Sequence, residues 1–314
     1  MKLTLQQRTS RMQNLKAAEN TKCGRRMYIR NYLPGFAVYD AAPACDASAF
    51  ENLKALAEAG VDVLLLPSQA LDRKIAKKFT QLCHYFELRV LFTVSDWEAA
   101  PSAQWRYEKM PRILQILEEC GFDGIFADMS RWTPESSTAH DPQLEDMLWQ
   151  LYTYVHSRGG ILVLRTRDGQ EPPCIDQVYD YLMVSSAVPM LQTQGFVLPE
   201  KADSFAAAIP FLQLPLLTRE NEKQWQKYRT LYAPMVQNVM LAYLDIQACA
   251  DIVSTLPAGV HGSMFVGDVK YLAVANLSGE PYTLKLKEQW TDRVTQENAD
   301  TFAVQPGQLL MLAK

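Results

Sequence analysis

Apolar runs without polar alternation recur along most of this sequence, and they constrain its fold more than any other feature. Strands with one solvated face alternate polar and apolar residues, whereas strands buried on both faces of a parallel sheet are continuously apolar. The runs therefore predict a parallel sheet with helices on its outer side. They lie at 36–41, 61–67, 88–95, 122–129, 159–166, 179–186, 206–215 and 237–244.

Helical periodicity fills most of the intervals between these runs. Residues 48–59 place apolar side chains at helical spacing and are followed by Gly60, which suits a helix C-cap. Residues 141–157 begin with Asp141-Pro142, an N-cap followed by proline at the first helical position. Strands alternating with helices predict a compact (β/α)8 TIM barrel. Similar patterns lie at 70–87 and 103–120, and weaker ones at 174–180, 199–207, 219–236 and 246–254.

The pattern of apolar and polar residues changes near the end of the chain. Residues 255–314 contain short alternating strands separated by Gly, Pro, Asn and Asp turns, with no helical pattern between them. This pattern predicts a small antiparallel all-β domain after the barrel. We expect a polar, basic N-terminal segment at 1–26, the barrel as catalytic domain at 27–254, and the β domain at 255–314.

Composition excludes several classes of partner. The formal net charge of −4 provides no basic field for nucleic acid or an anionic membrane. No apolar run reaches the ~18 residues of a membrane span, and none resembles a signal peptide. The 6 cysteines form no CxxC pair and the 4 histidines are isolated, so no disulfide framework, zinc site or Ser-His-Asp triad is expected. We expect a cytoplasmic protein without a metal or organic cofactor, and its oligomeric state stays open.

Two segments share the same order of residue types, and this order distinguishes aspartates at the start of a strand from aspartates at its end. In AGVDVLLLP (59–67) and CGFDGIFAD (120–128), a helix end, a glycine, an apolar residue and an aspartate precede the strand. Asp62 and Asp123 therefore lie at the N-terminal face of a barrel, which serves stability. We expect Asp123 to bond backbone amides of its turn. Asp128 lies about 16 Å away at the opposite mouth, where barrel enzymes carry their chemistry.

Polar and aromatic residues follow several of the predicted strands, and parallel strands end at one mouth. Carboxylates and arginine bind sugar hydroxyls, while aromatic rings stack on the apolar faces of sugars. Hydrolysis of a glycosidic bond needs two carboxyl groups about 5 to 9.5 Å apart. We therefore predict a carbohydrate substrate. The predicted substrate-binding residues are Tyr39, Asp40, Trp97, Trp132, Arg165, Gln213 and Asp245.

Residues 121–129, GFDGIFADM, resemble strand four of retaining α-glycosidase barrels, especially those of glycoside hydrolase family 31. In that family a G-x-D-G-x-W-x-D-M-N-E run carries the aspartate nucleophile. The segment is also similar to the G-F-D-G-x-x-x-D strand of family 114, and the domain order is similar to the α-amylase superfamily. The resemblance implies that Asp128 is the nucleophile. Ser130-Arg131 replace the Asn-Glu pair, Phe126 replaces the tryptophan, and no acid follows the run at 179–186.

These observations predict a glycoside hydrolase in which Asp128 is the nucleophile or stabilises an oxocarbenium-like transition state. Asp168 and Asp96 are the candidates for the general acid, with Glu220 behind them. One alternative is a non-catalytic carbohydrate-binding or interaction barrel that has lost its general acid. Another is a metal-dependent barrel enzyme that uses Asp40, Asp96 and Asp128 as oxygen ligands.

Overall fold

The computed structural model describes most of the chain from residue 35 onward, and the predicted N-terminal segment 1–26 lies outside it. The described residues are 35–39, 41–66, 72–95, 105–130, 142–166, 178–186, 196–201, 206, 216–218, 221–223, 225–227, 231, 242–245, 256–266 and 269–314.

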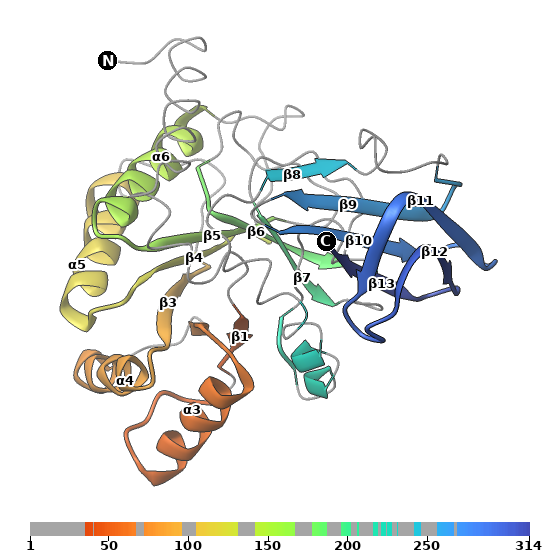
Figure 1. Cartoon of the computed structure of the whole chain (residues 1–314). Helices are drawn as coiled ribbons and strands as arrows, with labels where there is room; N and C mark the ends of the chain where they lie inside the picture. Colours follow the sequence, from red (N-terminus) through yellow and green to blue (C-terminus); the bar gives the residue numbers. More distant parts are fainter. Residues whose placement is uncertain are drawn as a thin grey trace.

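A curled parallel sheet forms the first layer of the fold (Figure 1). Within the described residues it has seven strands, and each lies beside the next one along the chain, from β1 to β7. Beyond β1, Leu217 forms a parallel bridge with Ala37. This confirms the parallel sheet, while a closed eight-stranded barrel stays a prediction. The strands are β1 (Phe36–Val38), β2 (Val63–Leu66), β3 (Arg89–Val94), β4 (Gly124–Asp128), β5 (Ile161–Arg165), β6 (Tyr181–Ser186) and β7 (Phe196–Lys201).

Helices on the outer side connect the first five strands, as the periodicity predicts (Figure 1). Gly60 caps the first of them in the left-handed region with φ of 93°, a conformation that costs glycine little. Pro111 lies in the first turn of α5, where its missing N–H breaks no helical hydrogen bond. The helices are α3 (Ala47–Ala59), α4 (Arg73–Tyr85), α5 (Met110–Cys120), which follows a π-helical turn η2 (Trp105–Lys109), and α6 (Pro142–Ser157).

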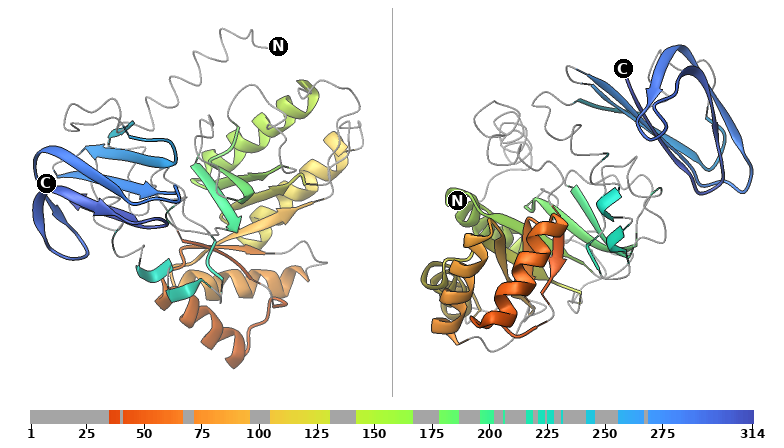
Figure 2. Two further views of the ribbon diagram at one scale, coloured as in Figure 1. Left: turned by 90° about the vertical axis from the view of Figure 1, so that its right-hand side faces the viewer. Right: turned by 60° about the horizontal axis from the view of Figure 1, so that its bottom comes forward.

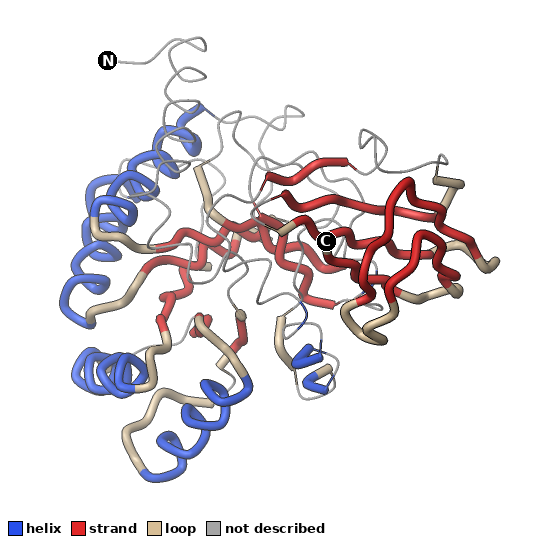
Figure 3. Tube along the Cα trace, in the orientation of Figure 1, coloured by secondary structure: helices blue, strands red, loops and turns tan. Residues whose placement is uncertain are grey.

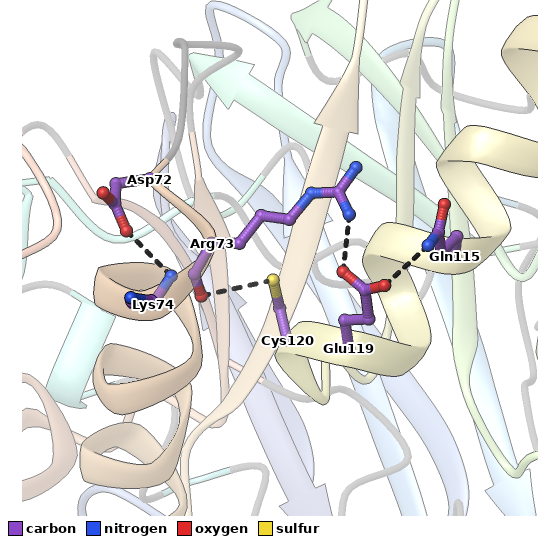
Figure 4. Close-up of polar contacts among 6 residues, drawn as sticks. All are labelled: Asp72, Arg73, Lys74, Gln115, Glu119 and Cys120. Carbon is purple, nitrogen blue, oxygen red and sulfur yellow. Dashed lines mark hydrogen bonds and ion pairs between the residues drawn. The ribbon is translucent and has the colours of Figure 1, made fainter.

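Polar contacts join the start of α4 to the end of α5 (Figure 4). The Asp72 carboxylate accepts from the Lys74 amide at 2.8 Å and so caps α4. Arg73 donates from Nη1 to Glu119 at 2.6 Å, and the Cys120 thiol lies 3.8 Å from the Arg73 carbonyl oxygen. The amide of Gln115 donates to the other Glu119 oxygen. Because the charged pair is well exposed, we assign most of the packing energy here to the buried side chains beneath it.

Side chains alternate between two cores along each parallel strand. The inner face gathers Phe36, Val63, Leu65, Leu91, Phe126, Ile161, Val163, Tyr181, Met183 and Leu216. The outer face packs under the helices through residues such as Leu64, Val90, Ile125, Leu162 and Leu182. Burial on both faces is the reason why these strands show no polar alternation.

A second sheet is antiparallel and has the strand order β12-β11-β13-β10-β9-β8. Figure 3 shows its strands as a group on the right, away from the helices that cover the parallel sheet. Its own core includes Trp290 and Phe302. The opposite face of β10 and β13 belongs to the same apolar cluster as the outer face of the parallel sheet, and Arg293 there donates to the Leu231 carbonyl. The strands are β8 (Ala242–Asp245), β9 (Val260–Val266), β10 (Lys270–Asn276), β11 (Tyr282–Asp292), β12 (Asn298–Val304) and β13 (Leu309–Ala313).

The structure departs from the last two predicted barrel strands. The seventh described parallel strand is β7, which precedes the predicted run 206–215, and of that run only Ala206 is described, in a helical conformation. The sequence of β7, FVLPEK, contains a proline and two charged residues, so it forms no continuous apolar run. A strand at the end of a sheet tolerates such residues. The run at 237–244 contributes to β8, which pairs antiparallel with β9. A short apolar strand has the same pattern in either type of sheet.

Aspartates at the amino ends of β2 and β4 clamp the neighbouring strand. The carboxylate of Asp62 accepts from the Gly35 amide at 2.7 Å, while the Asp62 amide donates to the Gly35 carbonyl at 2.7 Å. Asp123 makes the same pair of bonds with Val90, at 2.8 and 2.9 Å. Both aspartates are structural, as predicted, although the amide bound by Asp123 belongs to β3 rather than to its own turn.

Asp180, at the amino end of β6, forms a third clamp of this kind. It bonds both backbone groups of Leu162, at 2.8 Å each. A histidine from the last turn of the helix before the clamped strand reaches two of these carboxylates. His84 Nε2 lies 2.8 Å from Asp123, and His156 Nε2 lies 2.9 Å from Asp180. Each clamp therefore fixes the register of two strands, and in two cases it also fixes a helix end.

We expect Asp123→Ala to lower the free energy of unfolding by about 1–3 kcal/mol, because the Val90 amide loses its acceptor in a partly buried site. Asp123→Asn keeps one acceptor oxygen and should lose less. Urea denaturation measures both values. Asp300→Ala is the matched control, since that carboxylate bonds only the neighbouring Thr301 hydroxyl. Equal stability of Asp123→Ala and the control would contradict the clamp.

The hydrogen bond to Asp123 raises the pKa of His84 above its usual 6.5, against a smaller opposing effect of burial. A raised pKa in the folded state means that His84 contributes its stabilisation below the unfolded pKa and loses it as pH rises through the folded pKa. The stability difference between the parent and His84→Gln should therefore be largest near pH 5.5 and shrink toward pH 8.5. Urea titrations at both pH values measure it, and a difference that grows with pH would refute this assignment.

Candidate active site

Asp128 and Arg165 lie side by side at the carboxyl ends of β4 and β5. The two residues are register partners, and Arg165 Nη1 lies 3.6 Å from Asp128 Oδ2. The Ser130 amide donates to Asp128 Oδ1 at 3.0 Å, in the turn that follows the strand. The side chains of Asp128 and Arg165 are 19% and 30% exposed, so both are accessible to solvent. Both oxygens of the carboxylate thus face a donor.

The pair caps the apolar inner face of the parallel sheet. Phe126 on β4 and Val163 on β5 belong to the inner core, and strand alternation sets Asp128 and Arg165 on the same face, one step closer to the carboxyl ends. Below the pair this face is mainly apolar, although the buried Thr93 of β3 lies opposite Phe126, and Arg89 shares the face at the amino end of β3. This is the edge where open and closed parallel α/β folds bind their ligands.

Tyr39 lies on the other side of the sheet. It is 4% exposed, belongs to the outer core, and packs on Phe79 of α4 with ring centroids 4.9 Å apart. Burial, with smaller effects from Cys83, Asp46 and Cys45, raises the pKa of its phenol. Tyr39 does not meet Asp128, because adjacent residues of a strand point to opposite faces and Val38 holds the inward position.

A cavity of about 500 Å³ adjoins Tyr39 on that outer side. Its described lining includes Ala55 and Leu56 of α3, Leu217, Thr218 and Glu222. Neither Asp128 nor Arg165 belongs to the described lining. This cavity is therefore separate from the ion pair at the inner edge of the sheet.

The remaining predicted site residues are placed less fully. Asp245 ends β8 of the antiparallel sheet, opposite Ser263, so it does not follow a strand of the parallel sheet as predicted. The apolar run that contains it was assigned to the wrong sheet. The others lie outside the described residues: Asp40, Asp96, Trp97, Trp132, Asp168, Gln213 and Glu220.

Sequence reasoning missed two groups beside Asp128. The Ser130 amide holds one carboxylate oxygen, and a backbone donor leaves no side-chain signal. Ser95 directly follows β3, and continuing the register in which Val94 faces Ala127 sets it opposite Asp128. Ser95 is uncharged, so its residue type does not suggest a catalytic role. Its place directly after a predicted strand is the one sequence signal that could have identified it.

Two absences hold within the described ranges of the chain. No group of three or more His, Cys, Asp or Glu residues there is arranged to hold a metal ion. None of the helices in those ranges is both long and apolar enough to cross a bilayer.

The fold is shared with solved amylase structures. A protein assigned as an α-amylase from Salmonella typhimurium superposes with a TM-score of 0.54 over 90% of this chain and 82% of its own, at 11% identity. The maltogenic amylase from S. marinus gives 0.56 over 91% of this chain and 67% of its own, at 8% identity. No protein-family model matches the sequence, and no curated protein matches it. At these identities the likeness concerns the fold alone.

A double-mutant cycle with Asp128→Asn and Arg165→Gln should give a coupling free energy of unfolding below about 1 kcal/mol. The reason is that the pair is 3.6 Å apart and open to water, where ion pairs contribute little. Urea denaturation of the parent, both single variants and the double variant measures it. A coupling above about 3 kcal/mol would indicate a desolvated structural pair and argue against an accessible site.

Proposed function

We propose that this protein is a glycoside hydrolase that acts on a carbohydrate, with Asp128 at the centre of its site. The observation that carries the proposal is a solvent-accessible aspartate at the carboxyl end of β4, on the inner face of a parallel sheet. Barrel enzymes place their chemistry at this edge. The fold likeness to two amylase structures supports the same class of reaction.

The contacts of Asp128 suit a group that acts as an anion. The Ser130 amide donates to one carboxylate oxygen, and the Arg165 guanidinium lies 3.6 Å from the other as an ion-pair partner. A backbone N–H group and a guanidinium both interact more favourably with a negatively charged carboxylate than with a neutral carboxyl group. Asp128 would therefore attack the anomeric carbon, or stabilise the positive charge that develops there, rather than protonate the leaving group.

The general acid would come from a loop that follows another strand. Asp168 and Asp96 are our candidates, with Glu220 behind them, because each follows a predicted strand or lies shortly after one. Asp40, Trp97, Trp132 and Gln213 would contact the sugar, as would Arg165 where its donors extend past Asp128. Tyr39 and Asp245 lose their support as sugar ligands, since neither lies on the inner face with Asp128.

Incubation with a panel of α- and β-linked oligosaccharides and 4-nitrophenyl glycosides tests this function. The parent should release reducing sugar or nitrophenol, and Asp128→Asn should reduce kcat/KM at least about a thousandfold, because the amide cannot supply the negative charge. Asp300→Asn, on the exposed β12, is the control and should keep full activity. Proton NMR of the first product anomer then distinguishes retention from inversion.

Three other results would contradict the proposal in different ways. Sugar binding without turnover, equal in parent and Asp128→Asn, would indicate a binding barrel. Turnover that a chelator abolishes would indicate a metal-dependent enzyme. Turnover that survives in Asp128→Asn would move the reaction to other residues.

A further inference from the structure

An aromatic cluster lies open to solvent between α3 and α4, which run side by side on the outer side of the sheet (Figure 2). Phe50 of α3 lies 6.2 Å from Tyr85 of α4, measured between ring centroids, and both rings contact Phe86 at 4.9 and 5.1 Å. Tyr85 is 72% exposed and Phe50 is 36% exposed. The rings of Phe50 and Tyr85 thus remain exposed to solvent although each contacts other aromatic rings.

The cluster borders a groove with a volume of about 420 Å³. We call it the α3–α4 groove and define it by Phe50, Leu82 and Tyr85 as its apolar wall and Asp46, Lys78 and Gln81 as its polar rim. Its volume falls in the range of small-ligand sites and holds one or two sugar rings. The groove is separate from Asp128, which lies on the inner face of the sheet.

The side chains of the polar rim make few polar contacts with other described residues. The side chains of Lys78 and Gln81 form no hydrogen bond or ion pair with any residue that the structure describes. Asp46 uses Oδ1 to cap α3 through the Ala49 amide at 2.8 Å. The rim therefore offers both donors and acceptors beside open aromatic faces.

We propose that the α3–α4 groove binds a sugar ring, as a second carbohydrate site distinct from the one at Asp128. A sugar ring presents an apolar C–H face, which stacks on an aromatic ring, and hydroxyls at its edge, which both donate and accept. The choice of a sugar as ligand rests on the proposed function. An extended peptide fits less well, because two helices wall the groove and provide no free backbone edge for strand pairing.

The substitution series uses the exposure of Tyr85, which lets its side chain change without loss of the fold. Tyr85→Ala removes the stacking surface, whereas Tyr85→Phe keeps the ring and loses only the hydroxyl. Tyr107→Ala is the matched control, because Tyr107 is 75% exposed but has no aromatic neighbour among the described residues and borders no described cavity. All variants are made in full-length Asp128→Asn protein, so that sugar is not consumed, and thermal unfolding confirms the fold.

Binding is measured by calorimetry and by NMR of ring-labelled tyrosines, with maltotriose, cellotriose, xylotriose and chitotriose as probes. At least one trisaccharide should bind and shift the Tyr85 resonance. Tyr85→Ala should weaken that binding at least about tenfold, while Tyr85→Phe and Tyr107→Ala should change it less than about threefold. No binding by any probe, or binding that Tyr85→Ala leaves intact, overturns the groove site.

The two proposals fail separately. Turnover by the parent together with an unperturbed Tyr85 would leave the hydrolase standing and refute the groove. Binding that depends on Tyr85 but comes with no turnover by the parent would leave the groove standing and refute the hydrolase.

Discussion

The register of the parallel sheet is the constraint on which the rest of this structure depends, and aspartates at the amino ends of its strands hold it. In each clamp one residue bonds both the amide and the carbonyl of a single partner in the neighbouring strand. A slip by one residue would break both bonds and would also turn every side chain to the wrong face. Asp128 lies opposite Arg165 because β4 pairs with β5 in the register that begins where the Ile161 amide donates to the Asp123 carbonyl.

Close backbone approach reinforces this register. Gly124 follows Asp123, and a Cβ atom there would collide with the carbonyl of Ile161 on β5. The glycine allows β4 and β5 to approach at their amino ends, where the Ile161 amide also donates to the Asp123 carbonyl. The G-x-D-G part of the strand-four segment thus has a structural explanation that is independent of any catalytic role. The similarity to glycosidase strands therefore includes residues that serve packing, and Asp128 is the residue for which we propose a chemical role.

Two polar arrangements lie on opposite sides of the same sheet. The inner edge carries the Asp128 carboxylate, which accepts from the Ser130 amide and pairs with Arg165, above a mainly apolar core. The outer side carries an aromatic groove between α3 and α4. The two proposed sites therefore lie on opposite sides of one layer of strands and need not share residues.

Secondary structure was predictable where local pattern and long-range pairing agree. The first six strands and the four clear helices follow from continuous apolar runs and helical spacing, and the caps at Gly60 and Pro111 follow from backbone geometry. The pattern failed at β7, whose proline and charges hide an end strand, and at β8, which joins the other sheet. An apolar run records how deeply a strand is buried, but it carries no information about which strand lies beside it.

The amino-acid sequence by itself determined the alternation of strands and helices, the structural place of Asp123 and the position of Asp128 at the carboxyl end of its strand. Those features depend on spacing along one segment, which the chain carries locally. Only the tertiary structure decided that Arg165 stands beside Asp128, that Tyr39 faces the helices, and that Phe50 and Tyr85 meet at a groove. These are contacts between distant segments, and they are set by sheet register and by the face to which each side chain points.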